Sequence, residues 1–429
     1  MTNEYKLGGT WMLITIAFRN IWRNKRRTVF CFTAVGIAVL FIVVYSAMID
    51  GMTRNINDRV QIFELGHVRV VSAQYEAENE YMPVQYPIGF NAENPNGKNW
   101  RDLAALIYEV PGVRAVFPRI AVFAALQESV VKHAILWGLN IEAEMAANHF
   151  NLTKRSDGLQ EGRWPSPGTN ECAVGYAFAR RAGLSIGDRI PLRTTSAQFS
   201  DRFWSPVITG IFDFDFIRYD EQFIITDIER LQRLLALGDG TQSLVIFADD
   251  ERQSAAIAAQ VQNLLGSDSV VTDWRDNYWV AMMRMVIPIY LIIFLVFLIV
   301  ASFLIINTMV MVIHERIKEI GMMGSLGMTR REIVAVFFYE SLFLAVFGAL
   351  CGVVVGGAIA AIGSNYPIRF TDLYGNMFSD MPMGNSIFFQ FSFARLVMAW
   401  LMGVIIASVF TLIPSLKSAF VEPVEALRR

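Results

Sequence analysis

The chain has few cysteines and histidines, the residues that many secreted and metal-dependent proteins use for disulfides and metal sites. Its 429 residues include three cysteines and four histidines. Cys31 and Cys351 fall inside apolar runs and Cys172 stands alone in a polar region, so no pair is evident for a structural disulfide. The histidines share no metal-ligand spacing. The sequence therefore predicts neither a disulfide framework nor a bound metal.

Motifs for an energy source are also missing. No GxxxxGK[ST] phosphate loop occurs. Glu340 is the one charged residue in the apolar run 333–362, and a single acid does not support an ion relay. For Glu340 we favour a structural polar contact over a role in a coupling movement, and a proton relay is the remote alternative. We therefore expect no catalytic residue and no cofactor bound by this chain, and we expect any energy to come from a partner.

Long apolar runs are what the chain does have. Hydrophobic residues make up 54% of it and the mean hydropathy is +0.39, which is too apolar for a single soluble domain. Each run is long enough for a transmembrane helix, and the first lacks the short apolar core of a cleaved signal peptide. The predicted spans are 29–48, 286–313, 333–362 and 396–413.

Positive charge next to the spans predicts their direction. Lys and Arg cluster within 1–28, 314–332 and 414–429, so these segments and both termini are expected in the cytoplasm. Residues 49–285 and the loop 363–395 are then outside. The second span would be about 42 Å long as a helix, longer than the hydrocarbon core, so we expect it to continue as a stalk into the outer domain.

The outer segment reads as an α+β domain. Strand, helix and strand patterns follow one another at 67–72, 101–110 and 113–120, and again at 243–248, the 254–265 region and 269–272. These two βαβ-like halves flank a β-rich insert at about 138–240. Within the insert, the alternation FDFDF at 212–216 predicts a half-buried strand with three aromatic rings on one face. An edge that binds a peptide or protein is the alternative, and a metal site is a remote one.

Small residues recur every four positions in the third span. Gly348, Gly352 and Gly356 would lie in one stripe, where the backbone of another helix can approach closely. We interpret this stripe as a helix-packing face.

The segment between the second and third spans has an unusual composition for a solvated loop. Thr329 and Glu332 form a T-x-x-E capping box that predicts the start of the third helix, while 316–319 can continue the second. Between them, GMMGSLGM predicts a short, weak helical turn whose apolar side chains suit an adaptable protein contact. Docking onto a partner is the favoured interpretation, and packing of the segment against the chain's own membrane face is the alternative.

Several motifs resemble one family. EIGMMGSLGMTRREI followed by FFYESLFLAVFGALCGVVVG resembles the signature of FtsX-like ABC transporter permeases, and ITIAFRNIWRNKRRTVF and SAFVEPVEALRR resemble that family's amphipathic elbow and C-terminal end. VPGVRAVFPRI, ECAVG and GLSIGDRIPL resemble a MacB-type periplasmic domain. The resemblance implies that 314–332 is a coupling helix on a separate ABC ATPase. Its contact residues would be Glu319, Gly321, Met322, Met323, Gly324, Leu326, Gly327 and Met328.

The size and layout are similar to those of the lipoprotein-releasing permeases LolC and LolE. This likeness implies a bacterial inner-membrane protein that pairs with a second permease, either the same chain or a paralogue, and with two ATPase subunits that carry ATP and Mg²⁺. It would work by mechanotransmission and pass lipoproteins to a periplasmic carrier. Two alternatives are MacB-like export of peptides or drugs with a periplasmic adaptor, and FtsX-like signalling that activates a cell-wall hydrolase without transport.

An acyl chain that is extracted from the bilayer needs an apolar cavity to bind in. Moving it out of the bilayer costs about 0.8 kcal/mol per CH₂, so we expect a greasy cavity at the outer end of the first two spans. The alternative is that these side chains face lipid or other helices. The proposed lining residues are Phe41, Val44, Tyr45, Met48, Met282, Met285, Ile289 and Tyr290.

Overall fold

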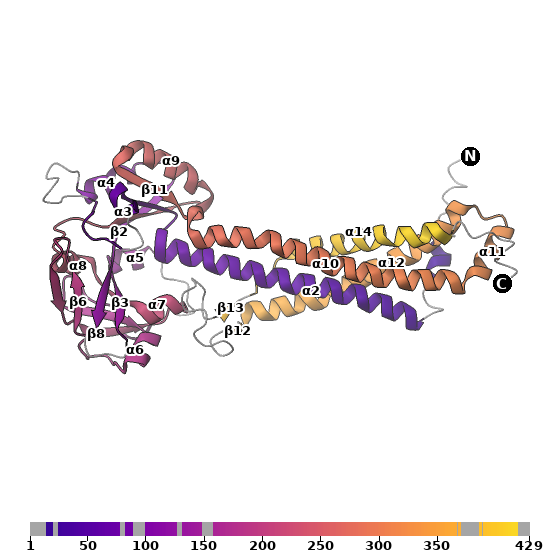
Figure 1. Ribbon diagram of the computed structural model, residues 1–429, viewed down its shortest axis with the longest axis horizontal. Coiled ribbons are helices and arrows are strands. Elements are labelled where there is room, and N and C mark those ends of the chain that lie inside the picture. The colour runs from indigo at the N-terminus through magenta and orange to yellow at the C-terminus, as the bar shows by residue number, and fades with distance from the viewer. Residues whose placement is uncertain are drawn as a thin grey trace. The chain divides into compact units, whose positions relative to one another are not determined.

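The structure is a computed structural model that separates into two units. It describes residues 14–19, 25–77, 82–88, 99–126, 131–147, 158–366, 368–369, 386–387 and 389–418. The helical unit comprises Met1–Met52, Arg284–Ile368 and Phe388–Arg429, and the β unit comprises Thr53–Met283 and Arg369–Ile387. The predicted elbow, the loop 363–395 and the tail lie largely outside the described residues. Figure 1 shows the ribbon with many of the elements labelled.

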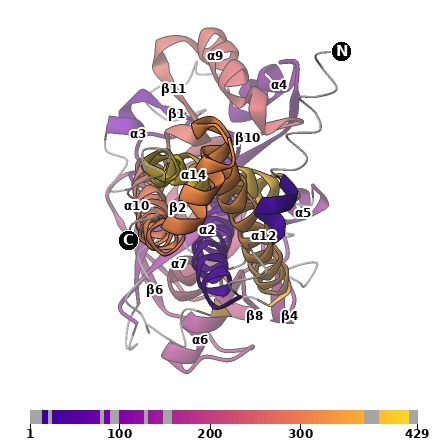
Figure 2. The same ribbon diagram turned by 90° about the vertical axis from the view of Figure 1, so that its right-hand side faces the viewer.

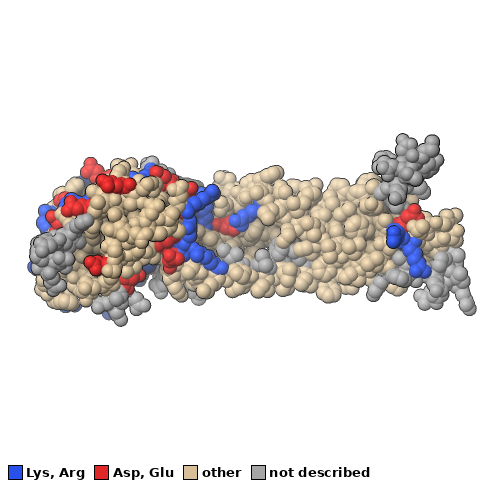
Figure 3. Space-filling view, turned by 90° about the horizontal axis from the view of Figure 1, so that it is seen from above, with Lys and Arg blue, Asp and Glu red and all other residues tan. Residues whose placement is uncertain are grey.

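Four helices of the structure are long and apolar enough to cross a membrane, as the sequence predicts. Figure 2 views them nearly end-on, and Figure 3 shows that charged residues are sparse over their visible surface. Two of these helices are longer than the apolar segments: the first continues well past residue 48, and the second begins at Tyr278, before residue 286. The four helices are α2 (Lys25–Arg59), α10 (Tyr278–Glu315), α12 (Arg330–Asn365) and α14 (Phe393–Ser418).

The start of α12 follows the predicted chemistry. Thr329 is the residue before the helix, and its side chain and the third helical residue form a capping box. The Thr329 backbone N–H donates to Glu332 Oε2 at 2.7 Å. The box supplies partners for N–H groups that the first turn of a helix leaves unsatisfied, so it fixes where α12 begins.

The glycine stripe of α12 lies against α2. A Cβ on Gly348 would be 3.0 Å from the Phe32 carbonyl oxygen, and a Cβ on Gly352 would clash with the Gly36 carbonyl. Gly356 faces Val43 in the same way. The two backbones approach too closely for any larger residue at the middle position.

A leucine at position 352 should therefore separate α2 from α12. Overpacking at a close helix contact costs about 1–3 kcal/mol, so the Gly352→Leu protein in detergent should unfold at a clearly lower temperature than the wild type. Val354→Leu is the matched control, because Val354 is exposed on the same helix. Equal thermal stability of the two variants would contradict the close approach.

The β unit contains one 11-stranded sheet. Its strand order is β11-β1-β10-β2-β3-β9-β5-β8-β4, and β6 pairs with both β2 and β7. The strands are β1 (Val68–Ser72), β2 (Val113–Leu126), β3 (His133–Leu139), β4 (Leu159–Gly162), β5 (Glu171–Gly175), β6 (Leu192–Thr195), β7 (Asp201–Trp204), β8 (Val207–Phe212), β9 (Phe223–Asp227), β10 (Ser243–Ala248) and β11 (Ser269–Asp273). A separate pair is formed by β12 (Ile368–Arg369) and β13 (Ser386–Ile387).

Short helices connect and cover the strands. Apolar residues of α4 and α9 join β1, β2, β10 and β11 in one buried core, whereas α6 and α8 contribute to a second core around β2, β3, β5 and β9. The helices are α3 (Ala73–Ala77), α4 (Trp100–Tyr108), α5 (Ile141–Ala146), α6 (Tyr176–Ala182), α7 (Ile217–Gln222), α8 (Ile228–Leu235) and α9 (Ser254–Leu265), with a π-helical turn η1 (Val60–Leu65) and 3₁₀ turns η3 (Glu251–Gln253), η4 (Gly266–Asp268) and η5 (Trp274–Asp276).

The two βαβ-like halves are present, but they interleave. One half is β1–α4–β2 and the other is β10–α9–β11. Strand β10 pairs antiparallel with both β1 and β2, and β1 pairs antiparallel with both β10 and β11. Each half is therefore a split βαβ unit with a strand of the other half between its own two strands. The strands of the insert continue the same sheet outward from β2.

The predicted strand over FDFDF is wrong beyond its first residue. Strand β8 ends at Phe212, and Asp215 has a left-handed backbone with φ of 52°. The Asp220 carboxylate accepts the backbone N–H groups of Phe214 and Phe216 at 2.9 and 2.8 Å, which closes the chain into a turn. The three phenylalanine rings are nevertheless fully buried together, so they do not offer a binding edge.

Candidate functional site

The segment between α10 and α12 contains a separate short helix. Helix α10 ends at Glu315 and α11 spans Ile317–Ser325. Between them, Arg316 has φ −98° and ψ 15°, outside the helical range. The expectation that 316–319 simply continues the second span is therefore wrong, because the chain turns at Arg316 and places that side chain in the interior.

Gly327 ends α11. It has φ of +93°, a left-handed conformation that glycine adopts without strain. The Met328 backbone N–H donates to the Met323 carbonyl at 3.1 Å, and the Gly327 N–H donates to the Gly324 carbonyl at 3.2 Å. These bonds form a glycine-dependent helix C-cap. At least one of the glycines in this segment is thus explained by backbone geometry.

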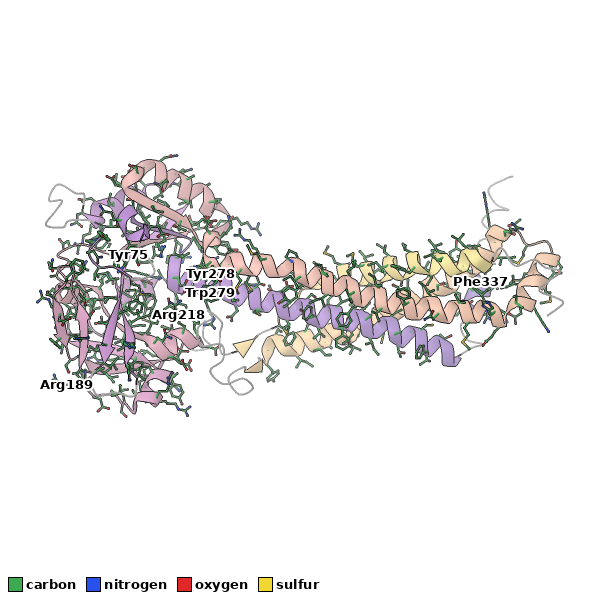
Figure 4. All side chains as sticks on the ribbon, in the orientation of Figure 1. Tyr75, Arg189, Arg218, Tyr278, Trp279 and Phe337 are labelled. Carbon is green, nitrogen blue, oxygen red and sulfur yellow. The ribbon has the colours of Figure 1, made fainter. Side chains whose placement is uncertain are left out.

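The apolar side chains of α11 divide between two faces. Met322 and Leu326 are 54% and 80% exposed. Met323 and Met328 pack onto a buried cluster of the chain's own helices, formed by Ile313, Ile320, Ile333 and Phe337; Phe337 is labelled in Figure 4. Gly321 is buried, Gly324 is half-buried, and Glu319 is partly exposed. The alternative of packing against the chain itself thus accounts for the inward methionines, and an outward apolar pair is left on the surface.

Glu340 has a charged neighbour within the helical unit. Arg316 Nη1 lies 3.5 Å from Glu340 Oε2, and the two side chains are 6% and 9% exposed. Arg316 Nε is also 4.0 Å from the Glu319 carboxylate. The favoured structural contact of Glu340 is therefore an ion pair with the corner between α10 and α11.

Aromatic rings meet where α2 and α10 lie side by side. The rings of Tyr45 and Tyr290 pack edge to face with centroids 5.1 Å apart, and Phe41 stacks with Phe297 at 6.1 Å. Both pairs join residues of the helical unit. We call this row the α2–α10 seam. Of the eight predicted cavity residues, Tyr45 and Tyr290 are brought together across it.

The other predicted cavity residues have different surroundings. Val44 and Met48 pack against a small cluster that includes Ala360 of α12 and Phe389. Met285 and Ile289 are exposed. Met282 is half-buried and belongs to the β unit.

The end of the first long helix is held inside the β unit by a buried arginine. Arg59, at the last position of α2, donates from Nη1 to the Phe214 carbonyl at 2.8 Å and from Nε to Asn55 Oδ1 at 2.7 Å. Its Nη2 lies 3.5 Å from the Asp215 carboxylate. The guanidinium is 5.2 Å from the centre of the Phe216 ring.

A second buried arginine holds the π-helical turn η1 that follows. Arg119 donates to the carbonyls of Phe63 and Ile62 at 3.0 and 2.8 Å, and it forms a two-point pair with the fully buried Glu144. The Tyr219 hydroxyl also donates to the Phe63 carbonyl at 3.1 Å. Burial raises the pKa of Tyr219, which keeps its phenol a neutral donor. We call the Arg59 and Arg119 contacts the helix anchor.

A cavity of about 500 Å³ lies beside η1 in the β unit. Tyr75, Arg218, Tyr278 and Trp279, labelled in Figure 4, are among its lining residues. Glu64 of η1 accepts from Arg218 Nη1 at 3.2 Å and from Asn277 Nδ2 at 3.1 Å. Glu64 therefore links the continuation of α2 to α7 and to the residue before α10.

Sequence reasoning missed the helix anchor and the cavity. Their members come from segments far apart in the chain, and no local spacing reports such a meeting. One signal was available: Arg119 lies in the middle of a largely apolar strand, and a charge at such a position needs a buried partner.

Comparison with known proteins gives matches along most of the chain. A family model described as FtsX-like permease C-terminal matches residues 291–423, and one described as MacB-like periplasmic core domain matches residues 28–264. The lipoprotein-releasing system transmembrane protein LolC of Xylella fastidiosa is 21% identical over 411 residues, which cover 92% of this chain and 91% of that protein. LolE of Haemophilus influenzae is 21% identical over 340 residues, covering 77% and 76%. The crystal structure of the periplasmic region of MacB from Actinobacillus actinomycetemcomitans is 10% identical, with a TM-score of 0.31, and the match covers 53% of this chain and 98% of that one.

Proposed function

The chain belongs to the FtsX-like permeases with a MacB-like periplasmic core domain, and from this membership we propose that it is the membrane subunit of an ATP-driven complex that releases lipoproteins from the inner membrane. In this proposal both termini and α11 are cytoplasmic and the β unit is periplasmic. A separate ABC ATPase, in two copies, binds ATP and Mg²⁺. A second permease, either another copy or a paralogue, completes the complex.

The observation that carries the proposal is the helix anchor. Helix α2 is continuous from Lys25 to Arg59, and the turn after it is fixed by Arg119 and Tyr219 inside the β unit. A helix is stiff along its axis, so a movement of its apolar part is transmitted to the core that holds its end. An anchor of this kind suits mechanotransmission, in which ATPase closure moves α11 and the long helices move the β unit.

Lipoprotein cargo is supported by the relatives and by the α2–α10 seam. LolC of Xylella fastidiosa matches over nine-tenths of both chains and is named for lipoprotein release. Acyl chains resist leaving the bilayer by about 0.8 kcal/mol per CH₂, so a release machine needs an apolar opening. Separation of Tyr45 from Tyr290 would open the seam between exposed residues such as Phe41 and Ile289.

The test is release from a defined membrane. The permease is assembled with its ATPase in lipid vesicles that contain a triacylated lipoprotein, and a soluble lipoprotein carrier is added. We expect transfer of the lipoprotein to the carrier only with hydrolysable ATP, and an ATPase subunit that binds but cannot hydrolyse ATP is the control. A complex that hydrolyses ATP normally and transfers nothing would refute lipoprotein release.

A further inference from the structure

A buried charge pair joins three helices at one end of the helical unit. Arg316 occupies the single non-helical position between α10 and α11, and Glu340 lies on α12. Their closest side-chain atoms are 3.5 Å apart and both side chains are almost completely buried. Glu340 is also the only charged residue in the apolar run 333–362. A charge in such a run is costly unless it is paired, so the Arg316–Glu340 contact calls for a physical explanation.

The surroundings of the Arg316–Glu340 pair strengthen the interaction between the two charges and bring α11 close to it. Ile313, Ile320, Ile333 and Phe337 of the same three helices form a buried apolar cluster, and the Arg316 and Glu340 side chains are themselves almost completely buried. An ion pair interacts more strongly in such a low-dielectric environment than on a surface. The guanidinium also lies near Glu319 of α11, at 4.0 Å. Arg316 is therefore positioned to hold α11 and α12 in one arrangement.

The backbone alone offers a weaker connection from α11 to α12. The chain between them passes through Gly327, whose left-handed conformation is one of several open to glycine. A short link containing such a residue can bend when α11 is pushed. The Arg316–Glu340 pair connects the residue just before α11 to α12 through side chains that are almost completely buried, so it resists that bending.

We propose that the Arg316–Glu340 pair is the joint that makes the α10–α11 corner and α12 move as one body. This inference rests on the proposed function in one respect, the docking of α11 on an ATPase. Movement of α11 would then reach α12 as well as α10. Because the glycine stripe of α12 lies against α2, the joint supplies a path from α11 to the first long helix. Arg316 and Glu340 are thus positioning residues for coupling.

The experiment measures distances inside one permease, with no cargo present. Spin labels are placed at Met311→Cys on α10 and Phe347→Cys on α12, two partly exposed positions, after Cys31, Cys172 and Cys351 have been replaced by serine. The full permease–ATPase complex in lipid is compared without nucleotide and with trapped ATP. Four labelled proteins are compared: one with Arg316 and Glu340 unaltered, the single variants Glu340→Gln and Arg316→Gln, and a double variant that exchanges the charges (Arg316→Glu with Glu340→Arg). Ser341→Ala is the control, because the Ser341 hydroxyl donates to the Phe337 carbonyl of its own helix.

With the pair intact, the label distance should change by less than about 2 Å on ATP binding, the scale of small packed-helix shifts. Either single variant should broaden the distribution or shift it by at least about twice that amount on ATP binding, and the exchange should restore the narrow distribution. If the single variants give the same distance distributions as the unaltered chain in both nucleotide states, the proposed joint is refuted. An exchange that behaves no better than its single variants would also refute it.

Failure of a variant to assemble and failure of the proposed function give different results. If Glu340→Gln fails to assemble, recovery of assembly and of the narrow distribution by the exchange supports the joint, and an exchange that also fails to assemble overturns it. Failure of the proposed function is recorded independently, as absence of ATPase binding or of lipoprotein transfer by the unaltered complex.

Discussion

A glutamate at position 326 should leave the permease folded and inserted but unable to couple to its ATPase. Leu326 is 80% exposed and follows directly on α11, so the substitution removes little packing within the chain. In a docked complex the same position would be buried against the partner, where an unpaired carboxylate is strongly unfavourable. We expect at least about a tenfold loss of permease-stimulated ATP hydrolysis, equivalent to about 1.4 kcal/mol or more of lost coupling.

The measurement is ATP hydrolysis and co-purification of the ATPase with the permease in lipid. Leu326→Met is the matched control, since it keeps an apolar side chain of similar size and should behave as the wild type. Gly324→Asp, half-buried on the same helix, should uncouple in the same manner. If Leu326→Glu retains both ATPase binding and stimulation, the exposed face of α11 is not the docking surface.

Removal of the Arg119 side chain should strongly destabilise the β unit. The Glu144 side chain is fully buried and its two-point partner is Arg119, so Arg119→Ala leaves a buried carboxylate without its cation. Breaking a buried pair in this way costs about 3–5 kcal/mol. The substitution also removes two of the donors that hold η1.

Denaturant unfolding of the full permease in detergent measures this effect. The double variant Arg119→Met with Glu144→Leu is the control, because replacing both charges by apolar groups of similar volume is often neutral for stability. We expect the double variant to recover most of the lost free energy of unfolding. If the free energy of unfolding of Arg119→Ala lies within about 1 kcal/mol of the wild-type value, the pair contributes no more than a surface ion pair does.

The elements of this fold that depend on residues close together in the sequence were predicted well. Apolar runs located the four long helices, and the Thr329 capping box located the start of α12, because both features act within one helix. The two βαβ-like halves were visible from periodicity. Their interleaving was not, since strand order depends on pairing between segments far apart in sequence.

The predictions that failed depend on particular side-chain contacts that residue spacing does not reveal. FDFDF alternates as a strand does, yet the Asp220 carboxylate captures two of its backbone N–H groups and bends it. The corner at Arg316 replaced a predicted helical continuation, because Glu340, remote in sequence, binds the arginine side chain. For the residues predicted to contact an ATPase, the sequence supplied an apolar set but not its division into the exposed Met322 and Leu326 and the inward Met323 and Met328.

The interleaved sheet also determines when the β unit can fold during synthesis. Strand β1 has β10 and β11 as its neighbours, and both come from the far end of the unit's sequence. A nascent chain therefore carries β1 unpaired until almost the entire unit has been made, just before the second long helix emerges. Unpaired strand edges promote aggregation in such intermediates. The yield of this protein should therefore depend on how well this incompletely folded segment is protected during synthesis, as well as on the stability of the finished molecule.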